Sequence, residues 1–392
     1  MRTLPLVSFV MLAVLSLLCQ GGSDLVSAAQ DVDGKRVNFP TFDDVELGGT
    51  FYRSTPGAGK KDKDTVVLLL HDFRHNKGGG SQEDGLPQLA GQLQKEGYAV
   101  LSFDFRGFGN SKSVSPKFWT FPHNSKGIRG VSKKNPPASI DEKDFTPNYF
   151  ITLVNDIAAA RTYLNVMNDA SEVNSSNIIL VGAGQGATLG ALWLASECRR
   201  QKDNQSNNPN LNLIGAPPQF RSLDEPEGND IAAAVWLTIY PALEGKLVGT
   251  SVIKAIMDET KKASKPIPTY FLYAKNDVKA GDFLNKNPDL KALFAEQSKK
   301  KGGVKEKAVP GAGELTGSKL LSSRLPTADF ILDYLNNVVE ERGSRVRKDR
   351  QDKNYAFCWS MPWPTNAQRR SVAKLPGEPV MHLIPLEVLG MR

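Results

Sequence analysis

Short apolar runs alternate with longer helical stretches from about Gln30 to Gly343, and this alternation constrains the fold more than any other feature of the sequence. The runs lack the polar alternation of a half-exposed sheet, as is typical of strands that are covered on both faces. They are Val66–Leu70, Tyr98–Phe103, Ile178–Val181, Ala232–Ile239 and Pro268–Tyr273. The pattern predicts an α/β fold with a doubly wound, mostly parallel sheet flanked by helices.

Six segments between and after these runs have a helical pattern, and two inserts interrupt the rhythm. The predicted helices are Asp84–Glu96, Tyr149–Asn165, Ala187–Arg200, Ser251–Ala263, Asp289–Lys300 and Thr327–Glu341. The insert 113–148 is rich in proline and aromatic residues, which is typical of a loop that covers a functional site as a lid. The insert 201–229 is dominated by Asn, Gln, Pro and charged residues, so we expect a solvated loop. The predicted α/β domain therefore spans residues 30–343 and includes both inserts.

The first 29 residues have the pattern of a secretory signal peptide. Arg2 precedes an apolar stretch from Leu4 to Leu18, and small residues at Ser27 and Ala29 fit a cleavage after Ala29. The apolar stretch is shorter than the roughly 20 residues that cross a bilayer, so we expect export to the periplasm or the extracellular space. The mature chain would keep Cys198 and Cys358, which allow at most one disulfide, and the sequence leaves their pairing open.

The positive charge of the chain is concentrated in residues 343–392. The whole chain has a formal net charge of +7, and this segment, with nine basic and four acidic side chains, carries +5 of it. The body is nearly neutral, so no nucleic-acid-binding face is expected. Residues 344–392 form a basic, proline-containing tail whose apolar residues follow no sustained helical or strand periodicity. We expect its removal to cost little stability, and one hypothesis gives it a contact with an anionic surface.

The most specific local pattern is a strand that runs directly into Gly182-Ala183-Gly184-Gln185-Gly186, followed by a helix. This is the layout of the nucleophile elbow G-x-S-x-G, but its central residue is Gly184, which has no side chain to attack a carbonyl. The same glycines match a dinucleotide-binding loop, G-x-G-x-x-A. Against that alternative, the turn follows two earlier strands instead of lying in an N-terminal βαβ unit. The acidic residue expected about 20 residues later, at the end of a second strand, would fall in the basic and polar stretch after Cys198.

Two further motifs follow the strands that precede this turn. His71-Asp72-Phe73 follows the first strand, and a D-x-R-G-x-G-x-S run from Asp104 to Ser111 follows the second. Together with the glycine turn, these motifs closely resemble the α/β-hydrolase superfamily, in the branch of dienelactone-hydrolase-like esterases and serine aminopeptidase-like enzymes. The resemblance covers about Thr65 to Glu341. It implies an oxyanion hole with one N–H group from Asp72 or Phe73 and a second from Gln185.

The resemblance also implies the positions of a catalytic triad, and two of its three members are replaced. Asp277 follows the strand that ends at Tyr273 and occupies the position of the acid. Glu314, in the loop that starts at Pro310, stands where the histidine is expected, and Gly184 stands where the serine is expected. A substitute base would have no nucleophile to activate.

The remaining histidines and Arg106 have simpler interpretations than catalysis. His71 and His75 lie at the predicted oxyanion loop, where His71 is expected to orient the loop by hydrogen bonding. His123 is a histidine of the first insert and His382 belongs to the tail. Within the resemblance, Arg106 is expected to tie loops together.

The leading hypothesis is an exported protein with a degenerate triad that binds a small molecule or a protein and needs no cofactor or metal. Backbone N–H groups at the turn would still be able to hold an anion or a carbonyl oxygen. The alternative is an active esterase or peptidase-like hydrolase with a rearranged site, in which the carboxylates of Asp277 and Glu314 activate a water molecule.

Overall fold

The computed structural model describes residues 34–41, 43–73, 79–132, 134–194, 230–239, 242–243, 246–247, 267–288, 290–292, 303–343, 345–348, 356–360 and 381–385. The expected signal peptide, the insert 201–229, the expected helix Ser251–Ala263, His75 and Cys198 lie outside the described residues. The chain divides into Met1–Asp33 and Gly34–Arg392, and all described residues belong to the second unit.

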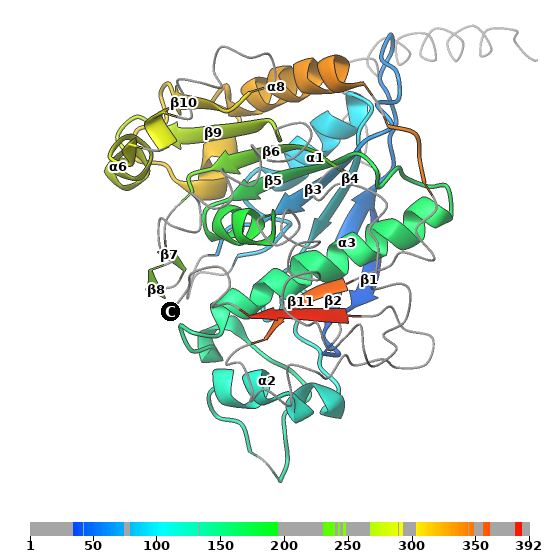
Figure 1. Ribbon diagram of the computed structural model, residues 1–392, viewed down its shortest axis with the longest axis vertical. Coiled ribbons are helices and arrows are strands. Elements are labelled where there is room, and N and C mark those ends of the chain that lie inside the picture. The colour runs from blue at the N-terminus through cyan, green and yellow to red at the C-terminus, as the bar shows by residue number, and fades with distance from the viewer. Residues whose placement is uncertain are drawn as a thin grey trace, which may run out of the picture. The chain divides into compact units, whose positions relative to one another are not determined.

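Eight strands form one sheet in the order β1-β2-β4-β3-β5-β6-β9-β10 (Figure 1). Strand β2 is antiparallel to both of its neighbours, β1 and β4, and the six strands from β4 to β10 in this order pair parallel to one another. The predicted mostly parallel sheet is confirmed. The strands are β1 (Gly34–Pro40), β2 (Glu46–Tyr52), β3 (Val66–Leu70), β4 (Ala99–Phe103), β5 (Ile178–Ala183), β6 (Ile231–Leu237), β9 (Thr269–Ala274) and β10 (Lys305–Val309).

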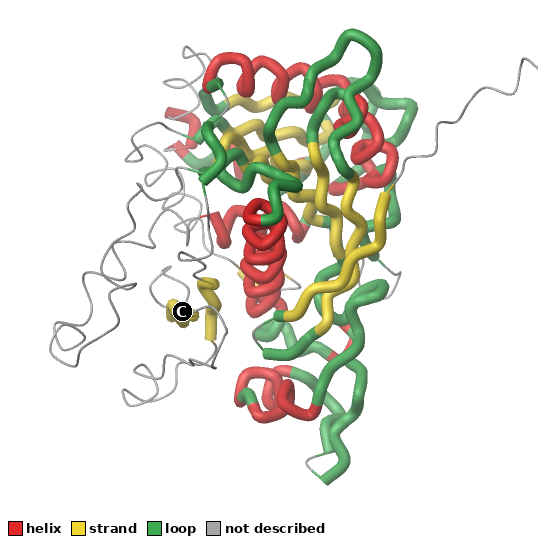
Figure 2. Tube along the Cα trace, turned by 90° about the vertical axis from the view of Figure 1, so that its right-hand side faces the viewer, coloured by secondary structure: helices red, strands yellow, loops and turns green. Residues whose placement is uncertain are grey.

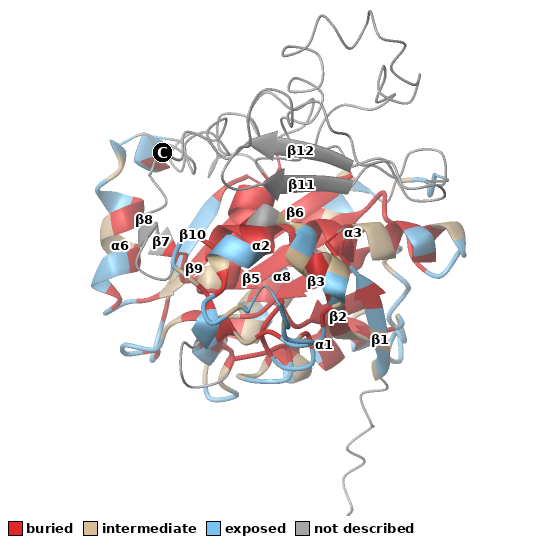
Figure 3. Cartoon of the chain, turned by 90° about the horizontal axis from the view of Figure 1, so that it is seen from below, coloured by how far each residue is buried: buried red, intermediate tan, exposed pale blue. Residues whose placement is uncertain are grey.

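Helices cover both faces of this sheet. Successive residues of each central strand pack in different clusters, because their side chains point to opposite sides of the sheet. Leu68 of β3 packs in a cluster that includes Ile157 of helix α3 (Val154–Asp169). The next residue, Leu69, packs in a second cluster with Leu89 of α1 (Leu86–Lys95) and Ile331 of α8 (Thr327–Arg342). Figure 3 shows the central strands in the colour of buried residues. This burial on both faces explains why the sequences of the central strands are unbroken apolar runs.

The first insert is a structured layer that packs through apolar side chains. It contains the short helices η1 (Pro116–Thr120), α2 (Pro122–Gly127) and η2 (Glu142–Asp144), which lie at the lower end of the chain trace in Figure 2. Phe118 and Phe145 are buried within it, and an isolated β-bridge joins Ile128 to Phe145. A further turn, η3 (Phe150–Leu153), leads into α3, so the expected helix Tyr149–Asn165 begins as a 3₁₀ helix and ends four residues later than expected.

Short elements complete the described chain. Helix α6 (Val278–Asn285) follows β9, and η5 (Gly317–Leu321) precedes α8. Strands β7 (Ala242–Leu243) and β8 (Lys246–Leu247) pair with each other, as do β11 (Ala356–Ser360) and β12 (Met381–Pro385) of the tail. None of the helices in the described ranges combines the length and the apolar character that crossing a membrane requires.

Candidate functional site

The glycine turn lies between β5, which ends at Ala183, and a helix whose described part covers residues 185–194. Gly184 occupies the turn with a φ of +54°, in the left-handed region that glycine adopts without the strain of a Cβ atom. Its N–H group donates to the carbonyl oxygen of Leu237 at 2.8 Å, which attaches the turn to the end of β6. The local geometry is therefore a sharp strand-to-helix turn at the carboxyl end of the parallel strands.

The carboxylate of Asp72 lies against this turn and accepts two backbone hydrogen bonds on one oxygen. Its Oδ1 atom is 2.8 Å from the nitrogen of Phe73 and 3.1 Å from the nitrogen of Gln185. Of the two residues considered for the first N–H donor, Phe73 thus supplies the N–H that converges with that of Gln185. Asp72 contributes the acceptor. The anionic group at these two N–H donors is therefore a side chain of the protein, the carboxylate of Asp72.

Two glycines make room for this carboxylate. A Cβ atom built on Gly184 would lie 1.9 Å from Asp72 Oδ1, and one built on Gly317 would lie 2.0 Å from Asp72 Oδ2. Both distances are far below any distance that a real Cβ contact allows. Gly317 also has a left-handed φ of +56° and follows the loop that carries Glu314. The Asp72 carboxylate is therefore enclosed between the turn after β5 and the segment after β10.

His71 fixes the peptide group between Asp72 and Phe73. Its buried ring accepts a hydrogen bond from the N–H of Phe105 on Nε2 at 3.0 Å, so the proton is on Nδ1 and is donated to the carbonyl oxygen of Asp72 at 2.8 Å. Burial lowers the pKa of His71, which keeps the ring neutral. The orienting contact expected for this histidine is present, since the N–H of the same peptide group points at Asp72 Oδ1.

The two residues of the proposed carboxylate pair follow neighbouring strands but have different surroundings. Asp277 follows β9, is buried and caps helix α6, accepting the N–H of Ala280 on Oδ1 at 3.1 Å. Glu314 follows β10 and is exposed to solvent. A cap is a common structural role for aspartate. Within the described part of the chain, no group of three or more His, Cys, Asp or Glu side chains could hold a metal ion.

Arg106 lies at the centre of a buried ionic network outside the turn. Its guanidinium binds both carboxylate oxygens of Asp43, at 2.7 and 3.0 Å, and Asp156 of α3 at 2.7 Å. Burial alone would raise the pKa of Asp43, but the adjacent Arg106 guanidinium outweighs it and holds that pKa well below its usual range. The side chains of His123 and Asn124 from the insert also contact Asp43. Through Asp43, Arg106 thus connects the insert to the body of the domain. The resemblance implies a role of this kind, in which the arginine ties loops together.

Sequence reasoning missed the role of the Asp72 side chain and the acidic partners of Arg106. The motif predicts a role only for the backbone N–H group of Asp72. A carboxylate next to predicted oxyanion donors, opposite a nucleophile position without a side chain, was the signal that could have revealed its role. Asp43 and Asp156 are 113 residues apart in sequence and match no local pattern, so only the fold brings them together.

The turn after β5 and the loop after β3 direct one N–H group each at the same oxygen atom. This is the arrangement of a nucleophile elbow and its oxyanion hole, at the top of a mostly parallel sheet. The protein has the α/β-hydrolase fold. In this hydrolase fold Gly184 stands at the sharp turn after β5, and the N–H groups of Phe73 and Gln185 both donate to Asp72 Oδ1.

Several solved structures are similar to the chain. An esterase from Pyrococcus furiosus has 15% sequence identity and a TM-score of 0.44, over 78% of this chain and 91% of its own. A serine hydrolase from Xanthomonas campestris, described as lacking a lid, has 11% identity and a TM-score of 0.40, over 80% and 96%. A putative α/β hydrolase from Agrobacterium tumefaciens has 15% identity and a TM-score of 0.42, over 78% and 97%. Neither a protein-family model nor a curated protein matches the chain.

Proposed function

We propose that this hydrolase-fold protein is a binding or interaction protein that does not use the serine-hydrolase mechanism. The observation that carries the proposal is the Asp72 carboxylate on the N–H groups of Phe73 and Gln185. Ester and amide hydrolysis needs such donors free, because they stabilise the negative charge that develops on the substrate oxygen. A resident carboxylate occupies them and repels that charge.

The other triad-equivalent positions support the same proposal. Gly184 supplies no nucleophile, and the space beside it is filled by Asp72. Asp277 caps helix α6, and Glu314, at the position where the resemblance places the histidine, is an exposed carboxylate and no imidazole base. In this proposal the fold serves as a scaffold. The region around Gly184 and Asp72 holds neighbouring loops together and does no chemistry.

The partner in this proposal is a small molecule or a protein, and the protein acts outside the cytoplasm after cleavage near Ala29. The support for export is the sequence pattern of the first 29 residues. Intact-mass measurement of secreted protein tests it directly. A product that begins at Gln30 is expected, and a product that retains Met1 would contradict export.

A pair of assays on the full-length protein tests the absence of hydrolysis. A fluorophosphonate probe and a panel of short aryl esters should give no labelling and no turnover above buffer, with an active serine esterase as positive control. Turnover without labelling that is abolished by Asp277→Asn or Glu314→Gln would establish the rearranged carboxylate site and overturn the proposal. Fluorophosphonate labelling of the wild-type chain would overturn it as well.

A further inference from the structure

The insert 113–148 carries a projecting loop, residues 129–138, of which residue 133 lies outside the described ranges. The two ends of the loop are held by isolated β-bridges, from Ile128 to Phe145 and from Ser139 to Ser113. The loop forms the lower tip of the chain trace, beyond α2 (Figures 1 and 2). Because the insert follows β4, this tip lies beyond the carboxyl end of that strand.

The positive charge of the body is concentrated in this insert. The insert has six basic and three acidic side chains, although the body as a whole is nearly neutral. Its exposed charged residues in the described ranges are Lys126, Arg129, Lys134, Lys143 and Asp144. Asp144 lies beside Arg129, whose backbone N–H donates to the Asp144 carbonyl oxygen at 2.8 Å. Lys126 and Lys134 form no ion pair with a residue of the described ranges, so the exposed surface of the insert is positive.

A partly exposed tryptophan lies against the same loop. The indole N–H of Trp119 donates to the carbonyl oxygen of Pro137 at 2.8 Å. The Trp119 ring packs edge-on against the buried ring of Phe118, with centroids 4.8 Å apart. Val131 of the loop is also partly exposed and packs against the core. The insert thus presents apolar groups in fixed positions together with exposed basic side chains.

We propose that the insert docks on an anionic lipid surface through the projecting loop and Trp119. Basic side chains are attracted by the negative headgroups of a bilayer. Tryptophan suits the headgroup region, because its ring is apolar and its N–H group is polar. The exposed cations are mainly lysines, which act as point charges and fit a surface of many headgroups. A single defined phosphate or carboxylate partner would instead favour the planar fork of arginine.

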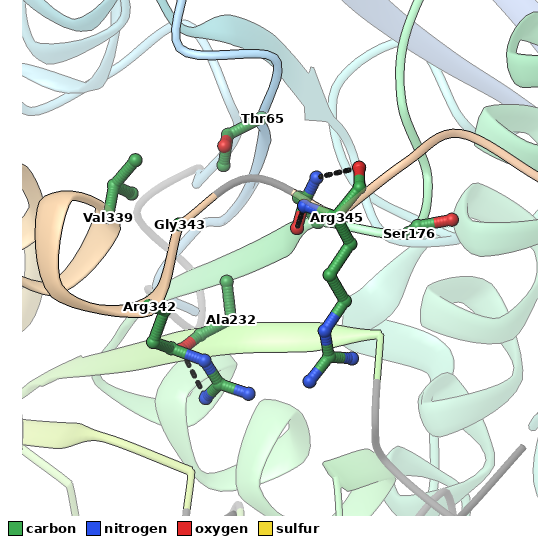
Figure 4. A pocket seen from close by; sticks show the side chains of 8 residues that line it. Thr65, Ser176, Ala232, Val339, Arg342, Gly343 and Arg345 are labelled. Carbon is green, nitrogen blue, oxygen red and sulfur yellow. Dashed lines mark hydrogen bonds between the residues drawn. The ribbon is translucent and has the colours of Figure 1, made fainter.

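This surface is separate from the basic tail and does not depend on whether the elbow is catalytic. The start of the tail lies at the other end of the parallel strands, where the backbone of Arg345 bonds to the side chain of Asn177, just before β5 (Figure 4). The insert is anchored to the body through the contacts of His123 and Asn124 with Asp43. Docking of the insert therefore holds the whole domain at the lipid surface.

Flotation of the full-length protein with lipid vesicles tests this contact. Wild-type protein should float with vesicles of phosphatidylcholine and phosphatidylglycerol but not with phosphatidylcholine alone, and about 1 M sodium chloride should release it by screening. Lys126→Gln with Lys134→Gln should weaken the binding by about tenfold or more, because each lysine near an anionic surface adds to the attraction. Lys61→Gln with Lys95→Gln is the matched control. It makes the same change of charge with exposed lysines that precede β3 and β4, and it should leave the binding unchanged.

Two further measurements identify the partner and the orientation. Anionic vesicles that contain brominated phosphatidylcholine should quench the fluorescence of wild-type protein more than that of Trp119→Phe, because Trp119 lies at the lipid surface. Binding to soluble polyaspartate without binding to vesicles would assign the surface to an acidic protein and overturn the proposal. No vesicle binding by wild type, equal losses in the two lysine pairs, or equal quenching of wild type and Trp119→Phe would overturn it as well. Circular dichroism and melting temperature establish that each variant is folded.

Discussion

The carboxylate of Asp72 lies in the space that a side chain on Gly184 would have to occupy, with Oδ1 1.9 Å from the position of the missing Cβ atom. The same oxygen accepts hydrogen bonds from the N–H groups of Phe73 and Gln185, the expected oxyanion-hole donors. One side chain therefore accounts for the glycine at the elbow and for the occupancy of the donors. It also couples the loop after β3 to the turn after β5.

Replacing Gly184 with serine is expected to destabilise the protein. The new Cβ atom must displace the Asp72 carboxylate, and overpacking of this kind costs about 1–3 kcal/mol. Gly313→Ser is a matched control, because Gly313 has a similar φ of +56° but no atom within 4 Å of an added Cβ. Urea denaturation should show a larger loss for Gly184→Ser than for Gly313→Ser. Equal losses would show that backbone strain alone matters, and that the collision with Asp72 does not.

Removing the Asp72 side chain should rescue the Gly184→Ser variant. In the double variant with Asp72→Gly, the serine gains the space that the carboxylate vacates. A double-mutant cycle should therefore give a favourable coupling of about 1–3 kcal/mol, within the range for residues in contact. Additive effects in the cycle would contradict the contact.

Restored reactivity should need three changes together. Gly184→Ser with Glu314→His supplies a nucleophile and a base, but Asp72 still occupies the oxyanion donors. We expect fluorophosphonate labelling only when Asp72→Gly is added. Labelling of the double variant that retains Asp72 would show that the carboxylate leaves the oxyanion hole easily.

The buried His71 should make stability depend on pH. Burial holds its pKa below the ordinary value of 6.5, so below about pH 6.5 the unfolded chain takes up a proton that the folded chain resists. This contribution is fully present above pH 6.5 and is lost as the pH falls through the folded pKa, at no more than about 1.4 kcal/mol per pH unit. His71→Asn should be less stable at pH 7.5 and show a shallower decline toward pH 5. Parallel urea-denaturation curves for the two proteins across this range would refute the role of His71.

The network around Arg106 should be far more sensitive than a surface ion pair. Arg106→Met leaves the buried carboxylates of Asp43 and Asp156 without their cation, which should cost about 3–5 kcal/mol. Arg53→Met removes an exposed pair with Glu172 and should cost about 0–1 kcal/mol. Thermal and urea denaturation of both variants measure the difference. Similar losses in the two variants would mean that the network contributes little.

We expect the first residues of the tail to contribute to the stability of the protein and the remainder of the tail to be dispensable for it. The backbone of Arg345 bonds to the buried side chains of Asn174 and Asn177, and Arg347 and Lys348 bond to Asn168. Deletion of 344–392 breaks these hydrogen bonds, at a net cost of about 1 kcal/mol each, so the small loss expected from sequence no longer holds for that boundary. Deletion of 349–392 keeps them. Melting temperatures should therefore be clearly lower for the longer deletion, and equal values would contradict the docking.

The central strands and the glycine turn could be predicted from the amino-acid sequence, because both depend on local composition. Strands covered on both faces must be apolar throughout, and β3 was predicted at its observed bounds, Val66–Leu70. The sequence does not predict the edge strands β1 and β10, or β2, which lies next to the edge. They carry exposed, charged or glycine residues, as in the Lys-Glu-Lys start of β10, and sheet edges do not impose an apolar pattern.

The residue that fills the space beside Gly184 could be identified only from the folded chain. Asp72 and Gly184 are more than a hundred residues apart in sequence, and the parallel pairing of β3 with β5 brings the two ends together. The same is true of Gly317, which follows β10, and of the Arg106 network. A sequence pattern reports which residues a local conformation tolerates. Which carboxylate reaches a pair of N–H groups depends on strand order, and strand order is set by the packing of the whole sheet.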